Sequence, residues 1–167
     1  MSRFLTIVQL TLHEAARRRI LLAALLGALA FLVLYGIGFH YVAREAASHR
    51  GAPALQQRLV LNFFTLAGLY ATNFLVVLTA VLLPIDTLSG EISSGVMQTL
   101  AAKPIRRAEI VLGKWFAYWL VCAAYLVVVA GGVLAIAWFR GGFVPPNPVQ
   151  GVALMLLEAT CFVSLSI

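Results

Sequence analysis

The chain has 167 residues, of which 62% are hydrophobic and only 11% are charged. Soluble domains carry about 25% charged residues, so this composition excludes a soluble protein and indicates an integral membrane protein. The formal net charge of +6 comes from basic residues clustered beside apolar runs, where they set topology and attract anionic lipid head groups rather than nucleic acid.

Residues 2–18 are predicted to form an amphipathic helix that lies flat in the membrane interface. Polar side chains recur every three or four residues on one face of this helix, at Ser2, Thr6, Gln9, His13 and Arg17. Apolar residues cover much of the remaining surface. The arginines at 17–19 are expected to anchor the end of the helix at the lipid head groups.

Four apolar stretches follow, and we predict that each crosses the membrane as a helix. They span residues 20–42, 59–83, 115–139 and 150–167. Pro84 is expected to close the second of them, because proline lacks the amide donor that a helix needs. The predicted fold is therefore an all-α polytopic helix bundle forming one transmembrane domain over 1–167. The fourth stretch lacks a polar anchor at its end, so we expect the chain to be the N-terminal part of a longer protein.

Basic residues are divided unequally between the two sides of this predicted topology. The N-terminal segment and residues 86–114 together carry eight of them: Arg3, Arg17, Arg18, Arg19, Lys103, Arg106, Arg107 and Lys114. The opposite side carries four: Arg44, Arg50, Arg58 and Arg140. The positive-inside rule therefore predicts that the N-terminus and residues 86–114 are cytoplasmic.

Residues 86–114, referred to below as the charged segment, lie between two apolar stretches and must be exposed to water. Within them, Ile92, Val96 and Leu100 recur every four residues and form a narrow apolar stripe on a short helix. Pro104 ends that helix, and a second helix begins just after it. The stripe is too small for a core of its own, so it packs either on the bundle or in a groove of a partner protein. An ordinary charged loop is the alternative.

The charged segment resembles the cytoplasmic signature of ABC-2 type permeases, the membrane subunits of ATP-binding-cassette exporters, and especially the NosY-like group. The residues that carry the resemblance are Glu91, Gly95, Leu100, Pro104, Ile105, Arg107, Ile110, Gly113 and Lys114. Two positions depart from the family pattern: Val96 stands where a threonine is frequent, and Arg106 stands where a serine is frequent. These departures affect individual polar contacts and not the architecture.

The resemblance implies a cytoplasmic helix over residues 91–101 that docks on a separate ATPase subunit. The residues implied to couple the two subunits are Glu91, Ile92, Gly95, Val96, Leu100, Pro104, Arg107 and Lys114. ATP with Mg²⁺ would be bound by that partner, since Gly113-Lys114 lacks the preceding glycine that a phosphate-binding loop requires. The family pattern further implies a second permease subunit, forming a homodimer in the plasma membrane, and a complete subunit of six spans.

Polar residues within the predicted spans form a second candidate site. Asn62, Thr65, Thr72 and Thr79 lie on one face of the second span, with Asn73 adjacent. They either line a substrate path or hold helices together.

Glu158 lies inside the fourth span, where a carboxylate costs about 2.5–3.5 kcal/mol on insertion scales. It is expected to be protonated or paired, in either a functional or a structural role. Small residues at Ala23/Gly27 and Gly131/Gly132 are predicted to permit close helix packing.

The sequence contains no arrangement typical of an enzyme or a metal site, and Cys122 and Cys161 are expected to be free thiols inside spans. Two alternatives to the permease reading stay open. One is a secondary transporter driven by an ion gradient, for which only Glu158 supplies an intramembrane ionisable group. The other is a membrane scaffold or accessory protein that does not transport.

Overall fold

The computed structural model of the chain describes residues 8–13, 19–48, 54–93, 107–142, 145 and 147–166. The long helices in these ranges are α2 (Arg19–Ser48), α3 (Ala54–Ser93), α5 (Arg107–Gly141) and α6 (Pro148–Ser166). All four are long and apolar enough to cross a membrane. No residue in the described ranges lies in a strand, so the predicted all-α membrane fold is confirmed.

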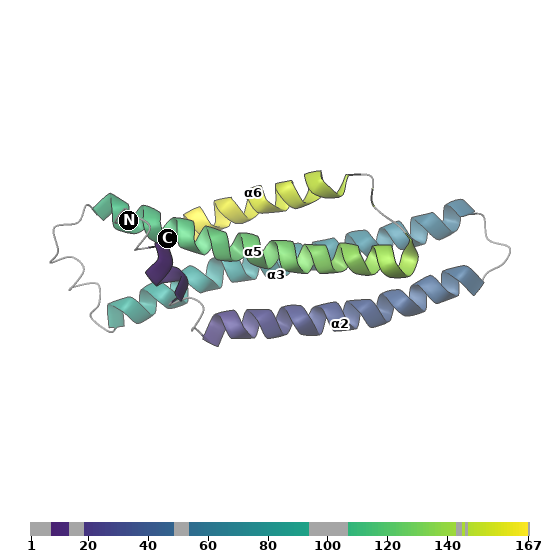
Figure 1. Cartoon of the computed structure of the whole chain (residues 1–167), viewed down its shortest axis with the longest axis horizontal. Coiled ribbons are helices and arrows are strands. Elements are labelled where there is room, and N and C mark those ends of the chain that lie inside the picture. Colours follow the sequence, from purple (N-terminus) through teal and green to yellow (C-terminus); the bar gives the residue numbers. More distant parts are fainter. Residues whose placement is uncertain are drawn as a thin grey trace.

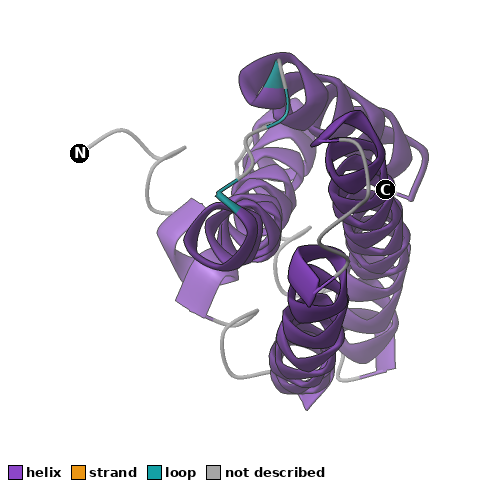
Figure 2. Cartoon of the chain, turned by 90° about the vertical axis from the view of Figure 1, so that its right-hand side faces the viewer, coloured by secondary structure: helices purple, strands orange, loops and turns teal. Residues whose placement is uncertain are grey.

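The four helices run side by side along the long axis of the molecule (Figure 1). Helices α3 and α5 contact each other, and each of them packs against both α2 and α6. In the most apolar stretch of each helix, the share of residues that are buried is 39% in α5 and 33% in α3. The shares in α2 and α6 are 6% and 11%. Helices α3 and α5 are therefore the centre of the bundle, with α2 and α6 on its flanks. Figure 2 shows the bundle end-on, with its helices packed beside one another.

The two ends of the bundle differ in what they carry. The C-terminal ends of α2 and α5 and the N-terminal ends of α3 and α6 lie toward one end of the bundle (Figure 1). The C-terminal end of α3 and the N-terminal end of α5 lie at the other end, beside the helical residues 8–13 (Figure 1). Val8 and Thr11 of that N-terminal segment are buried, while Gln9 and His13 are exposed. Both segments predicted to be cytoplasmic therefore belong to the same end of the bundle.

The core consists of three apolar clusters that follow one another along the bundle. The cluster at the connected ends of α2 and α3 contains Phe39, Leu61 and Ala137. The central cluster contains Ala28, Val76, Tyr125, Leu126, Val129, Ala130 and Ala159. The cluster at the opposite end contains Ala80, Leu83, Tyr118, Cys122 and Val163. Helices α3 and α5 contribute to all three clusters, which is why they are the most buried elements.

The helices extend past the predicted spans, and the largest difference is in α3. The apolar stretch of α3 finishes at Ile85, next to Pro84 as predicted, but the proline does not end the helix, which continues through the buried Pro84 to Ser93. Proline removes only one backbone hydrogen bond of the helix. In a membrane this loss costs less than ending the helix, because irregular backbone exposed to lipid leaves several polar groups without hydrogen bonds. Glu91 and Ile92 are thus the last turn of a long helix rather than the start of a separate one.

Helix α2 packs on the centre of the bundle through glycines of the other two helices. A Cβ atom on Gly68 of α3 would lie 2.5 Å from the ring of Tyr35, and one on Gly132 of α5 would lie 2.8 Å from Leu32. The predicted packing role is therefore confirmed for Gly132. For Gly27 and Gly131 it stays a prediction, because a Cβ on either would meet no atom of the described helices within 4 Å.

Candidate functional site

The charged segment begins at the end of α3 and finishes in the first turns of α5. Of its predicted coupling residues, Glu91 and Ile92 belong to the last turn of α3, and Arg107 is the first residue of α5. The other coupling positions up to Pro104 lie outside the described residues, namely Gly95, Val96, Leu100 and Pro104. The structure thus places both ends of the segment on the two central helices of the bundle.

Lys114 is the coupling residue whose side chain the structure describes. It lies one to two turns inside α5 and is only 6% exposed. A side chain so buried within its own chain has little surface left for a partner protein.

The predicted threonine stripe of α3 faces the interior of the bundle. Thr65, Thr72 and Thr79 are buried, and each hydroxyl donates to the backbone carbonyl four residues earlier at 2.8–2.9 Å. Hydroxyls that are satisfied within their own helix are typical of membrane helix packing. This geometry favours the packing role for the threonines over the substrate path. Asn62 is half-buried and lines a shallow apolar depression on α3 instead of joining them.

Asn73 and Glu158 are the predicted polar residues that the structure brings together. The amide Nδ2 of Asn73 donates to Oε2 of Glu158 at 2.9 Å, which links α3 to α6. Glu158 lies about 15 Å along α6 from Pro148 and about 12 Å from Ser166, at 1.5 Å per residue. The pair is therefore well inside the apolar part of the bundle. Its carboxylate side faces outward, since Glu158 is exposed while Asn73 is half-buried.

The second polar atom of the Asn73 amide has no partner. Its Oδ1 is buried and accepts no hydrogen bond from any described residue. A buried acceptor left unsatisfied costs about 1–3 kcal/mol. The amide directs its NH₂ group toward Glu158, and Oδ1 is left without a donor among the described residues.

Two indole groups connect α5 to α6 next to this pair. Trp119 Nε1 donates to the hydroxyl of Thr160 at 2.9 Å, and Trp115 Nε1 donates to the hydroxyl of Ser164 at 3.0 Å. Both hydroxyls also donate to carbonyls of their own helix, so each uses its donor and its acceptor capacity. These bonds were not predicted from the sequence. The sequence feature that could have indicated them is the spacing: Trp115 and Trp119 are four residues apart, and so are Thr160 and Ser164.

A hydrogen bond near the end of α6 fixes its register against α3. Ser166 donates to the carbonyl of Val81 at 3.0 Å, and this pair is separated by 85 residues, as are Asn73 and Glu158. An identical separation at two points, two turns apart, means that α3 and α6 run parallel without a shift between them. Helix α6 is therefore held by side-chain hydrogen bonds to α3 on one side and to α5 on the other.

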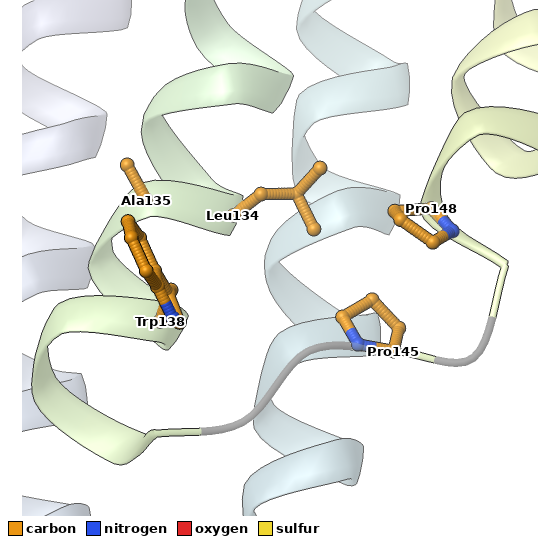
Figure 3. Close-up of a pocket in the computed structure, with 5 residues that line it drawn as sticks. All are labelled: Leu134, Ala135, Trp138, Pro145 and Pro148. Carbon is orange, nitrogen blue, oxygen red and sulfur yellow. The ribbon is translucent and has the colours of Figure 1, made fainter.

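An apolar cavity lies near the opposite end of α6. It has a volume of about 230 Å³ and is lined by Leu134, Ala135 and Trp138 of α5, by Pro145 before α6 and by Pro148, the first residue of α6 (Figure 3). These described lining residues are apolar apart from the indole of Trp138, so they suit an apolar chain. Within the described ranges, no group of His, Cys, Asp or Glu is arranged to hold a metal ion.

Comparison with known families identifies the protein class. The family model of the ABC-2 family transporter proteins matches residues 6–167, which is nearly the whole chain. Among curated proteins, none matches the sequence closely enough to be a relative. The match includes the four membrane-crossing helices and the charged segment that joins α3 to α5. The chain therefore belongs to the ABC-2 family and is a membrane permease of an ABC transporter, a transmembrane component that works with an ATP-binding subunit.

Proposed function

We propose that this chain is the membrane subunit of an ABC exporter of the NosY-like group in the plasma membrane, where it acts as a homodimer with its N-terminus in the cytoplasm. The charged segment would receive the movement of the ATPase and pass it to the membrane helices. The permease would bind no ATP itself, and ATP with Mg²⁺ would be held by the partner.

The observation that carries the proposal is the place where the charged segment joins the bundle. The segment connects α3 and α5, the two most buried helices, each of which packs against every other long helix. Because protein interiors are close-packed, a displacement applied to these two helices must be accommodated by their neighbours. A pull on the segment therefore acts on the whole bundle. A loop attached to α2 would instead transmit its movement first to a helix on the outside of the bundle.

The proposal is tested by purifying the permease together with its ATPase. Changing Ile92 and Val96 together to Asp places charge on the predicted docking stripe, and we expect the ATPase to be lost from the purified complex. The matched control is Val149→Asp, because Val149 is 79% exposed at the opposite end of the bundle. Retention of the ATPase by the Ile92/Val96 variant would refute the docking role of the stripe.

The proposed orientation predicts which residues are accessible from outside the cell. A single cysteine introduced at Val149 in a variant without Cys122 and Cys161 should react with a membrane-impermeant maleimide in intact cells. Labelling that requires permeabilised cells would reverse the topology. Export is tested in inside-out vesicles, where ATP should drive substrate into the lumen.

The alternative of a secondary transporter makes an opposite prediction about the energy source. Substrate flux through an ABC exporter is expected to stop when ATP is depleted and to survive an uncoupler. Flux that collapses with the uncoupler and survives ATP depletion would identify an ion-gradient-driven transporter. Absence of flux under both conditions, with the ATPase bound, would favour a scaffold or accessory protein.

A further inference from the structure

Two polar side chains meet on the outside of the bundle, at the end opposite to the charged segment. Nη1 of Arg140 in α5 lies 2.7 Å from Nδ1 of His40 in α2, and both residues are exposed. A guanidinium only donates hydrogen bonds, so Nδ1 is the acceptor and the ring carries its proton on Nε2. Protonation of Nδ1 would break this bond but leave the Nε2 donor in place. The pair therefore offers donors to its surroundings in either protonation state of His40.

The sequence supplies little negative charge at this end of the bundle. Residues 42–58 and 140–149, which join the helices there, contain one acidic residue, Glu45, and four arginines: Arg44, Arg50, Arg58 and Arg140. Glu45 comes five residues after His40, about 140° around α2, and so lies on a different face of that helix. The hydrogen bond that the described part of the chain gives Arg140 is the one to His40. The guanidinium charge is thus left without a counter-ion among the described residues, and its free N–H groups match an anion.

The depth of the pair indicates where that anion comes from. The apolar stretch of α5, Val111–Gly141, has 31 residues and is about 45 Å long, which matches a bilayer of about 40–45 Å with its head groups. Arg140 is the last residue but one of this stretch, so it lies at the level of the lipid head groups. Exposed aromatic side chains surround it, namely Trp138 and Phe139 on α5 and Tyr41 beside His40 on α2. Tryptophan and tyrosine concentrate at this level of a membrane.

An apolar stripe leads from the pair toward the middle of the membrane. Leu29, Val33 and Ile37 of α2 precede His40 by eleven, seven and three residues, so they share its face of the helix. All three side chains are exposed. A molecule with a phosphate at the pair and a hydrocarbon chain along this stripe would match both parts of the surface.

We propose that Arg140 and His40 bind the phosphate of an anionic phospholipid, in the leaflet on the side opposite to the charged segment. The planar guanidinium would donate to two phosphate oxygens, and Nε2 of His40 would donate to the phosphate as well. Such a lipid would join α2, a helix on the flank, to the central helix α5. The site goes beyond the proposed transport function and does not depend on the substrate or on the direction of transport.

The test compares lipids that share their acyl chains and differ in their head group. The purified permease is incubated in detergent with an equimolar mixture of dioleoyl phosphatidylglycerol, phosphatidylcholine and diacylglycerol, and the retained lipids are counted by native mass spectrometry. We expect phosphatidylglycerol to be retained about fivefold more than either of the others, the effect of about one basic residue at an anionic surface.

Two substitutions separate the charge from the contact between the helices. Arg140→Gln keeps a donor for His40 but loses the charge, and it should remove the preference for phosphatidylglycerol. His40→Asn can still accept a hydrogen bond from Arg140 but has no donor at the Nε2 position, and it should reduce the preference. The matched control is Arg58→Gln, because Arg58 is an exposed arginine at the same end of the bundle (Figure 1). It should retain the wild-type preference.

Four results would overturn the proposal. Equal retention of the three lipids, or the same loss of preference in Arg58→Gln as in Arg140→Gln, would mean that there is no site beyond the net charge. Displacement of phosphatidylglycerol by millimolar inorganic phosphate would assign the pair to a soluble anion. An unchanged preference in Arg140→Gln with a lower unfolding midpoint would leave the pair a packing contact alone. An unchanged preference with separation of subunits in size-exclusion chromatography, by Arg140→Gln and Glu45→Gln alike, would assign the guanidinium to Glu45 of a second copy.

Discussion

Gly68 is the position of α3 at which we expect an added side chain to be tolerated least. A Cβ there would lie 2.5 Å from Cε2 of Tyr35 and 2.8 Å from its Cζ. The Tyr35 ring has little room to withdraw, because the rings of Phe31 and Phe39 lie on either side with centroids 5.9 and 5.8 Å away. Its hydroxyl also donates to the carbonyl of Phe64 at 3.4 Å. The ring is therefore enclosed along α2 and held against α3.

The magnitude of the effect follows from comparing Gly68→Ala with Gly27→Ala. Overpacking a close contact costs about 1–3 kcal/mol, whereas alanine is favoured over glycine inside a helix by about 0.8–1.0 kcal/mol. A Cβ on Gly27 meets no atom within 4 Å. Both glycines are interior to long helices, so the helical gain is common to the two variants. The free energy of unfolding of Gly68→Ala should therefore be about 1–3 kcal/mol below that of Gly27→Ala.

The assay is reversible unfolding of the purified protein in mixed micelles, followed by far-ultraviolet circular dichroism. A second background separates the steric effect from any other effect of the substitution. In Tyr35→Leu the shorter side chain removes the clashing ring atoms, so Gly68→Ala should cost less in that background than in the wild type. Equal unfolding midpoints for Gly68→Ala and Gly27→Ala would refute the reasoning, and so would an unchanged penalty in Tyr35→Leu.

Three further predictions concern the contacts that hold the flanking helices and the two thiols. Trp119→Phe removes the indole donor to Thr160 and should lower the free energy of unfolding by about 0.6 kcal/mol, and at most about 1.7 kcal/mol; a double-mutant cycle with Thr160→Val that shows simple additivity would contradict this. Gly132→Ala should lower the free energy of unfolding less than Gly68→Ala does, since the atoms 2.8–2.9 Å from its Cβ are the terminal methyl groups of Leu32, which can move; a larger loss than that of Gly68→Ala would contradict this. Cys161 is exposed and Cys122 is buried, so mass spectrometry should show one rapid adduct with a lipid-soluble maleimide and a second only on unfolding; equal reaction rates would contradict the packing.

The number of long apolar helices was predictable because it depends on local composition. Apolar runs long enough to cross a bilayer mark such helices wherever they occur, and the structure has a helix long and apolar enough to cross a membrane at each of the four. The helix ends were less predictable. Pro84 lowers the helical tendency of its own neighbourhood, but the surrounding helices bury it and α3 continues to Ser93. Local propensity was overruled by tertiary packing.

The pairing of Asn73 with Glu158 shows what sequence alone does not contain. Each residue was identifiable as unusual, because an amide and a carboxylate inside apolar helices stand out. Their contact depends on the register of α3 against α6, which is set by bonds as distant as Ser166 to Val81. The same limit applies to Gly131 and Gly132. Adjacent helical residues differ by about 100° in direction, so only tertiary structure shows which of them faces α2.

The two flanking helices are attached to the central pair by different physical means, and this difference bears on how movement would spread. Lipid provides no hydrophobic drive for helix association, so packing and hydrogen bonds must supply it. Helix α2 contacts both central helices through close steric fits at Gly68 and Gly132, which are sensitive to small shifts along either helix. Helix α6 is joined to α3 through Glu158 and to α5 through the two indole groups, by hydrogen bonds of 2.9–3.0 Å that weaken steeply when their angle closes. We therefore expect a displacement of α3 relative to α5 to disturb the steric contacts of α2, and a rotation of α3 to break the hydrogen bond between Asn73 and Glu158.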